Sequence, residues 1–315
     1  MTVPLSETWP SLHYDTWSDT CAALHLRTQI VGKIRLATTP WLNHSWHVPL
    51  YVTARGLTTS PMPHGSLTFE IQFDFFEHVL EFAVSDGRTA RLDLKPQPIA
   101  DFRNAVMNVL SDLHLPVAIR DHPCEIVDAI PFSEDRAHAA YDADHAKQFW
   151  RVLVQVDRVF KQFRTRFLGK CSPVHFFWGS FDLAVSRFSG RRAPLHPGIA
   201  PGVAPIVMQE AYSHEVCSAG FWPGGSGADA SFYAYAYPEP VEFQRSLVRP
   251  AAASYSVDLH EFLLPYEAVR SAEDPDAALL SFLQSTYEAA ATTAKWDRAA
   301  LECAGGQVGI SRRVS

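Results

Sequence analysis

Residues 27–36 read RTQIVGKIRL, and residues 164–173 read RTRFLGKCSP. Each stretch contains Arg-Thr, one variable residue, two apolar residues and then Gly-Lys. The apolar residues over 17–31 and 145–168 recur at helical spacing, so each glycine stands where a C-terminal glycine would end a helix. The two stretches therefore predict the same local structure at two places in one chain.

A second similarity follows each glycine. Trp46 precedes Arg55 by nine positions, and Trp178 precedes Arg187 by nine. Both pairs lie in stretches rich in aromatic and β-branched residues, which favour strands. The repeated spacing indicates an internal duplication.

The order of elements repeats as well. Residues 66–76, SLTFEIQFDFF, alternate between apolar and polar as a half-buried strand does, and residues 213–221 are a weaker counterpart. Apolar residues over 99–113 predict a closing helix, and Asp274 followed by Pro275 predicts the start of another.

These patterns predict an α+β fold of two related halves, each built as helix, antiparallel strands and helix, packed about a pseudo-twofold axis. Residues 1–130 would form the first half. Residues 131–315 would form the second half and carry the long Pro/Gly loops and the pocket.

The composition excludes several classes of protein. The 315 residues are 47% hydrophobic and 19% charged, with a net charge of −7, so a non-specific grip on nucleic acid or anionic membrane is not expected. No apolar run is long enough to span a membrane, and the N-terminus does not resemble a signal peptide. Five cysteines without a CxxC pair favour a cytoplasmic protein. The oligomeric state is not predicted.

The stretch from Phe176 to Ser186 indicates a pocket. Read as one strand, it places Trp178, Ser180 and Asp182 on the same face, an aromatic and polar mixture suited to binding a small molecule. A partly solvated sheet face with Trp178 packed under a loop is the alternative.

Other parts of the second half fit the same pocket. Tyr233, Tyr235 and Tyr237 send three phenols to one side of a strand, where they could close the pocket and hydrogen-bond a ligand, although such rows are also common on half-buried sheets. Residues 189–205 and 222–230, the latter starting at Trp222, are rich in Pro and Gly and predict surface loops.

The 14 histidines raise the hypothesis of a divalent transition metal. The candidate ligands are His44, His47, His175 and His214. Neither HExxH nor a zinc-type Cys/His spacing is present. Hydrogen-bonding roles, or a general base beside Asp182 or Glu215, are the alternatives.

Two lysines and two arginines share the repeated positions. Lys33 and Lys170 each follow a glycine that we expect to end a helix, where a lysine complements the helix dipole. Lys170 also leads into the aromatic and polar face, so it is a candidate for binding an anion. Arg55 and Arg187 suit either a bound anion or structural bridges to Glu70 and Glu215.

The strings LHLRTQIVGKIRL, GKCSPVHFFWGSFDLAVSRFSGR and EAYSHEVCSAGFWPGG resemble a bacterial family of uncharacterised proteins, domain of unknown function 5996. The resemblance extends from about Trp9 to about Trp296. It implies no activity and no catalytic residue. The chain also has no GxGxxG, P-loop, GxSxG or kinase motif.

The favoured hypothesis is a small-molecule enzyme that uses acid–base or metal-assisted chemistry on an anionic substrate. Its candidate catalytic residues are His175, Asp182, His214 and Glu215. Its candidate substrate-binding residues are Lys170, Trp178, Ser180, Arg187, Trp222, Tyr233 and Tyr235. The alternatives are a non-catalytic binding or sensor protein and a protein-interaction scaffold. An enzyme should gather titratable groups with perturbed pKa values in one cavity, a binder should pair its polar groups, and a scaffold should lack a sizeable cavity.

Overall fold

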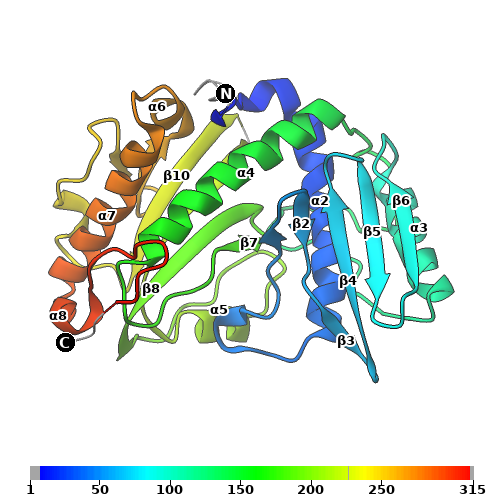
Figure 1. The fold of residues 1–315 in the computed structure, drawn as a ribbon, viewed down its shortest axis with the longest axis horizontal. Coiled ribbons are helices and arrows are strands. Elements are labelled where there is room, and N and C mark those ends of the chain that lie inside the picture. The colour runs from blue at the N-terminus through cyan, green and yellow to red at the C-terminus, as the bar shows by residue number, and fades with distance from the viewer. Residues whose placement is uncertain (1–7, 226, 313–315) are drawn as a thin grey trace.

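The computed structural model describes residues 8–225 and 227–312. Helices pack against two antiparallel sheets of six strands each (Figure 1), so the predicted α+β class is confirmed. The first sheet lies wholly within the predicted first half and the second sheet within the predicted second half.

The first sheet has the strand order β1-β2-β4-β5-β6, with β3 also paired to β4. Residues Phe69, Ile71 and Phe73 of β4 are buried, as their alternation predicts. Helices α2 and α3 lie behind this sheet in Figure 1. The bounds of these elements are α2 Tyr14–Thr38, β1 Tyr51–Val52, β2 Gly56–Thr58, β3 Met62–His64, β4 Leu67–Asp74, β5 Val79–Val84, β6 Thr89–Asp93 and α3 Ile99–Asp112.

The second sheet has the order β11-β12-β10-β9-β8-β7. Helices α4 and α7 cover one of its faces (Figure 1), and Asp274 caps α7 through the Ala277 amide as predicted. The bounds are α4 Ala143–Arg164, β7 His175–Phe177, β8 Asp182–Arg192, α5 Pro205–Ala211, β9 His214–Gly225, β10 Ala228–Tyr237, β11 Ser254–Ser256, β12 Glu261–Pro265, α6 Tyr266–Arg270, α7 Pro275–Thr293 and α8 Arg298–Leu301. Two short 3-10 helices are η1, Asn43–Ser45, and η2, Phe243–Arg245.

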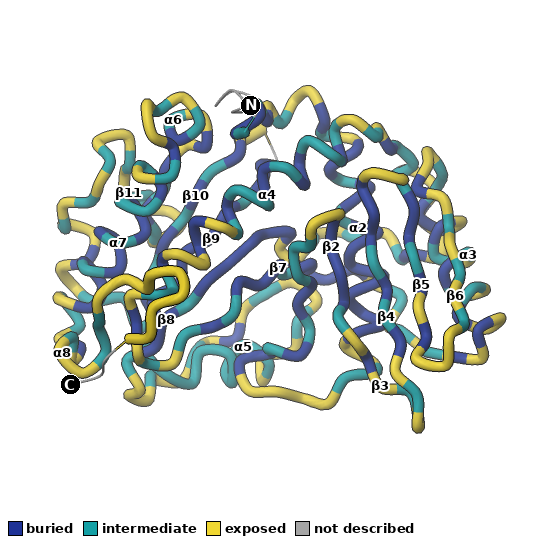
Figure 2. The backbone as a smooth tube through the Cα atoms, viewed as in Figure 1, coloured by how far each residue is buried: buried dark blue, intermediate teal, exposed yellow. Residues whose placement is uncertain are grey.

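The two sheets meet edge to edge. Leu50, next to β1, and Phe176 of β7 exchange backbone hydrogen bonds of 2.9 Å in each direction. Helix α2 contacts strands of both sheets, and most of its residues are buried (Figure 2). The core therefore continues from one sheet to the other around α2.

The structure corrects the reading of the two glycines. Gly32 does not end a helix, because α2 continues to Thr38. A side chain at Gly32 would collide with Trp178, so the glycine allows the helix and the indole to approach closely. Helix α4 ends at Arg164, before Gly169. The two Gly-Lys pairs thus have different surroundings, and the duplication and pseudo-twofold axis stay predictions.

Two further expectations were wrong in detail. Phe176 to Ser186 is not one strand, because a turn over residues 178–181 separates β7 from β8 and Phe181 has a φ of 61°. Residues 222–230 belong largely to the paired strands β9 and β10 rather than to a long loop. The segment 193–204 is a long connection, as predicted.

Two expectations from composition can be compared with the structure. All five cysteines lie in the described part of the chain and are free. No helix in residues 8–225 and 227–312 is long and apolar enough to cross a membrane. The signal-peptide prediction concerns a segment that begins with residues 1–7, which lie outside the described residues.

Candidate functional site

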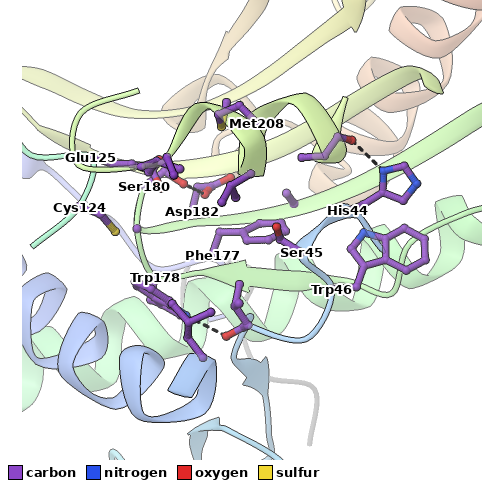
Figure 3. A pocket seen from close by; sticks show the side chains of 18 of the residues that line it. His44, Ser45, Trp46, Cys124, Glu125, Phe177, Trp178, Ser180, Asp182 and Met208 are labelled. Atoms are coloured by element: carbon purple, nitrogen blue, oxygen red, sulfur yellow. Dashed lines mark hydrogen bonds between the residues drawn. The ribbon is translucent and has the colours of Figure 1, made fainter. Parts of the chain in front are cut away.

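A cavity of about 480 Å³ lies between residues of the two predicted halves. This volume is typical of small-molecule sites. Strands β8, β9 and β10 form its floor, α2 and the segment 118–125 form one side, and α5 with residues 202–204 covers it. Figure 3 shows His44 and Trp46 toward one end and Cys124, Glu125 and Ser180 toward the other.

The floor comes from alternate residues of β8. Asp182, Ala184, Ser186 and Phe188 all line the cavity, because every second side chain of a strand points to the same side. At about 3.3 Å per residue, these four positions span about 20 Å. The cavity is therefore long enough to have two chemically different ends.

Six of the predicted site residues line this cavity. They are His44, Trp178, Ser180, Asp182, Tyr233 and Tyr235. Trp178 and Ser180 reach it from the turn between β7 and β8, and the tyrosines reach it from β10. The Trp178 indole donates a 2.8 Å hydrogen bond to the Val48 carbonyl, which fixes the ring in the wall.

Asp182 lies on the cavity floor, at the end that also holds Cys124, Glu125 and Ser180, which we call the Glu125 end. The Ser180 and Tyr233 hydroxyls each donate a hydrogen bond to one of its oxygens. Burial raises the pKa of Asp182, and these two hydrogen bonds act in the opposite direction by stabilising the charged form. Asp182 also raises the pKa of Tyr233 well above its usual value, after the larger effect of burial.

Glu125 is the second carboxylate of this end. Its backbone has a φ of 60°, and its amide donates a 2.7 Å hydrogen bond to the Pro201 carbonyl, next to the residues 202–204 that cover the cavity. No hydrogen bond or ion pair to its carboxylate is found among the described residues. Glu125 is exposed to solvent as a residue, but many protein atoms lie around its carboxyl, which faces the cavity. Burial, followed by the charge of Asp182, raises the pKa of Glu125 to about 7.

Gln29 of α2 holds the backbone that carries Glu125. Its side-chain amide donates to the Cys124 carbonyl at 2.8 Å and accepts from the Cys124 amide at 2.9 Å. His25, one helical turn earlier, bonds the Gly179 carbonyl at 2.8 Å. A side chain at Gly179 would collide with the Glu125 carboxylate. Helix α2 therefore holds the Glu125 segment and the Ser180 turn against each other.

Lys33 lines the same end from α2. Only 7% of the residue is exposed, and its ammonium lies 5.6 Å from the centre of the Trp178 ring. Burial lowers the pKa of Lys33, whereas Cys124 and Glu125 raise it. The helix-dipole role that we expected for Lys33 is wrong, because the residue lies inside α2 and more than a turn before its end.

The opposite end of the cavity is built around His44. Its Nδ1 bonds the Ala211 carbonyl at 2.8 Å, and its Nε2 lies 2.6 Å from the Lys170 ammonium. Burial, and after it the Lys170 charge, lower the pKa of His44 against the effect of the Ala211 hydrogen bond. Lys170 itself is exposed at the rim and lies over the Trp46 ring at 5.1 Å.

Arg187 lies away from the cavity, because it points to the other face of β8. Its guanidinium lies 3.4 Å from the centre of the Phe163 ring and 4.4 Å from that of Tyr287. The expected bridge from Arg187 to Glu215 is absent from the described residues, since Glu215 pairs with Arg191. The other expected bridge is also different, because Arg55 pairs with Asp74 and Glu77 rather than Glu70.

Several other predicted residues do not line the cavity. His175 is buried against Trp46, Tyr51 and Phe177, and its two ring nitrogens have no hydrogen-bond partner in the described part of the chain. Burial lowers its pKa to about 3. The remaining residues in this group are Lys170, which contacts His44 from outside the lining, and His47, His214, Glu215 and Trp222.

The four candidate metal ligands do not form one group. The rings of His44 and His214 lie 5.9 Å apart, but His47 accepts a hydrogen bond from the Leu42 amide and His175 is enclosed by aromatic rings. Within residues 8–225 and 227–312, no three His, Cys, Asp or Glu side chains are arranged to hold a metal ion.

Sequence reasoning missed Lys33, Glu125 and Tyr212 as lining residues. Extending the helical spacing past Gly32 would have indicated which face of α2 carries Lys33, but Gly32 was interpreted as the end of the helix. Tyr212, whose hydroxyl lies 2.7 Å from that of Tyr235, directly precedes a strand that was recognised. Glu125 lies in an irregular segment without periodicity, and no pattern in the sequence indicates its position.

Comparisons with known proteins identify a family and no function. A family model described as a family of unknown function, DUF5996, matches residues 9–303. Neither the curated proteins nor the solved structures gave a match. The match covers nearly the whole chain and agrees with the resemblance seen in the sequence. The chain therefore belongs to the DUF5996 family of unknown function.

Proposed function

We propose that the protein is an enzyme that performs general acid–base chemistry on a small organic molecule bound in this cavity. The observation that carries the proposal is the pair Glu125 and Asp182, two carboxyl groups of raised pKa that line the same cavity, Asp182 on its buried floor and Glu125 open to solvent. A group with a pKa near 7 both accepts and donates protons readily at neutral pH. Such perturbed groups in a cavity are typical of catalytic sites.

Each residue of the pair has a different role in this proposal. Asp182 accepts two hydroxyl hydrogen bonds, which stabilise its charged form and oppose the effect of burial on its pKa. Burial, and after it the charge of Asp182, raises the pKa of Glu125 to about 7, so that Glu125 exchanges a proton with the substrate near neutral pH. Tyr233 and Ser180 orient Asp182, and the aromatic residues around them exclude water from the bound molecule.

A binding or sensor protein is the second candidate, because some polar groups of the cavity are already paired with each other. Asp182 pairs with Tyr233, and Tyr212 pairs with Tyr235. A cavity that only binds needs no free titratable group, so the unpaired Glu125 carboxylate favours the enzyme. The scaffold hypothesis expected no sizeable cavity and is not favoured by this geometry.

The experiment is to incubate the purified protein with a small-molecule extract of bacterial cells and to follow all compounds by mass spectrometry. The enzyme proposal expects catalytic loss of at least one compound and gain of a product, both abolished in Glu125→Gln. Retention of a compound by the wild type without any conversion would support the binding protein. Conversion that proceeds equally in Glu125→Gln and Asp182→Asn would contradict the assigned residues.

A further inference from the structure

We propose that Lys33 binds a carboxylate of the ligand, so that the cavity selects a carboxylic acid with an apolar or aromatic body. The inference deepens the proposed function and rests on it for the location of the reacting group. The sequence predicted Arg187 as an anion-binding residue, but Arg187 lies on the other face of the sheet, whereas Lys33 faces the cavity.

The Lys33 ammonium is nearly buried and unpaired in the described part of the chain. The residue is 7% exposed, and neither a hydrogen bond nor an ion pair to its ammonium is found among the described residues. The Trp178 ring, at 5.6 Å, contributes only a cation–π contact. A nearly buried charge without a counter-ion is costly, and a bound anion would remove that cost.

The acids nearest to Lys33 do not neutralise its charge. Glu125 lies close enough to influence Lys33 but forms no ion pair with it. Because the pKa of Glu125 is about 7, the carboxyl carries only part of a charge at neutral pH. Asp182 is occupied by Ser180 and Tyr233. Neither acid therefore serves as a full counter-ion for Lys33.

Lys170 gives the contrast that makes this specific to Lys33. Lys170 is exposed at the rim and already contacts the His44 ring nitrogen at 2.6 Å. Arg120, at the mouth next to Lys33, is also a lining cation, but it is exposed to solvent. An exposed charge is hydrated and gains less from an anion than a desolvated one.

The charge balance favours a carboxylate over a phosphate. Inside the Lys33 end one buried ammonium faces two carboxyl groups, and the second cation, Arg120, is exposed at the mouth, so a dianion held on Lys33 would meet more repulsion than a monoanion. The rest of this end is lined by Ile119, Phe177 and Trp178, which suit an apolar or aromatic body. A carboxylate on Lys33 would place the neighbouring atoms of the ligand beside Glu125.

The test uses isothermal titration calorimetry with 2-naphthoate, its uncharged counterpart 2-naphthamide, and 1-naphthyl phosphate, at a pH slightly below neutral. The wild type should bind 2-naphthoate at least about tenfold more tightly than 2-naphthamide, as expected for a charge-assisted hydrogen bond. Lys33→Met and Lys33→Gln should lose this preference. Lys170→Met, the matched lysine at the other end, should keep it.

Four results would overturn the proposal. These are equal affinity for naphthoate and naphthamide, no binding of either to the wild type at millimolar concentration, a preference that survives in both Lys33 variants, and a Lys33-dependent preference for the phosphate over the carboxylate. Circular dichroism and thermal unfolding establish that the variants fold.

The proposed function fails separately from this inference. If Lys33 selects the carboxylate but no compound is ever converted, the anion site stands and the protein is a binder. If conversion depends on Glu125 while naphthoate gains nothing from Lys33, only the anion site is wrong. Glu125→Gln should itself strengthen naphthoate binding, because a partial negative charge beside the anion is removed.

Discussion

The two ends of the cavity use similar residue types in opposite ways. At the His44 end, the imidazole is bonded on both sides, to Ala211 and toward Lys170. At the Glu125 end, a carboxylate and an ammonium face the same space without a partner among the described residues. Paired groups hold a structure together, whereas unpaired ones cost stability and are available to a ligand. We therefore infer that the His44 end holds α5 over the cavity and that the Glu125 end performs the chemistry.

The largest effect should come from the wall that shapes the Glu125 end. A side chain at Gly32 would lie 2.3 Å from three atoms of the Trp178 ring. We expect Gly32→Ala to lower the free energy of unfolding by about 3 kcal/mol, because neither α2 nor the bonded indole moves freely. Urea denaturation measures this. Gly305→Ala, whose nearest contact would be 3.5 Å, is the control. Equal stability of the two variants would show that α2 or the Trp178 ring moves without cost and would contradict this prediction.

Two substitutions of Asp182 distinguish how its hydrogen bonds and its charge each affect the free energy of unfolding. Asp182→Ala leaves the Ser180 and Tyr233 hydroxyls without their acceptor, and we expect a loss of about 2 kcal/mol in unfolding free energy. Asp182→Asn keeps an acceptor and removes a buried charge, so it should be clearly more stable than the alanine variant. Chemical denaturation of both proteins decides this. Two equally unstable variants would mean that the charge itself is required.

Glu125 predicts a pH dependence of stability. Its pKa is about 7 in the folded protein and near the ordinary value of 4.5 when unfolded, so the folded state holds the proton more tightly. Wild-type stability should therefore fall, relative to Glu125→Gln, as the pH rises from about 4.5 to about 7. We expect a difference of about 1 kcal/mol above pH 7, since water in the cavity screens part of the charge.

Thermal unfolding of the two proteins at several pH values measures this difference. Because burial and Asp182 also raise the pKa of Glu261 to about 7, the wild type alone would not isolate Glu125. Subtracting the variant does isolate it. A difference that stays constant with pH would contradict the raised pKa of Glu125.

The smallest effect should come from His44. His44→Ala removes its hydrogen bond to Ala211, and we expect a loss of about 0.5 kcal/mol in local stability. Amide hydrogen exchange should quicken over α5, and the titration of Glu125 should stay as in the wild type. A changed Glu125 titration would break the division between the two ends of the cavity.

The sequence predicted the α+β class, the main strands and half of the cavity floor, because alternation and helical spacing record which face is buried. Asp182, Tyr233 and Tyr235 line the cavity for this reason, whereas Trp178 and Ser180 line it from a turn. The cavity-facing positions from Asp182 to Ser186 were predicted correctly, although a turn at residues 178–181 interrupts the expected strand.

Three errors have a common physical origin. Gly32 was read from its flexibility, but the structure uses it for close packing against Trp178. Arg187 was read from its charge, but aromatic rings enclose it. Glu125 lies in a segment whose path depends on bonds to Gln29 and Pro201, far away in the chain. Contacts between distant segments leave no periodic signal in the sequence.

The most direct test of the account is an NMR titration of the Glu125 side-chain carboxyl, assigned by comparison with Glu125→Gln. We expect an apparent pKa of about 7 in the wild type, a lower pKa in Asp182→Asn and a higher one in Lys33→Met, since the Asp182 charge raises it and the Lys33 charge lowers it. A wild-type pKa near the ordinary value of 4.5, unchanged in both variants, would contradict the claim that this end of the cavity is built for acid–base chemistry.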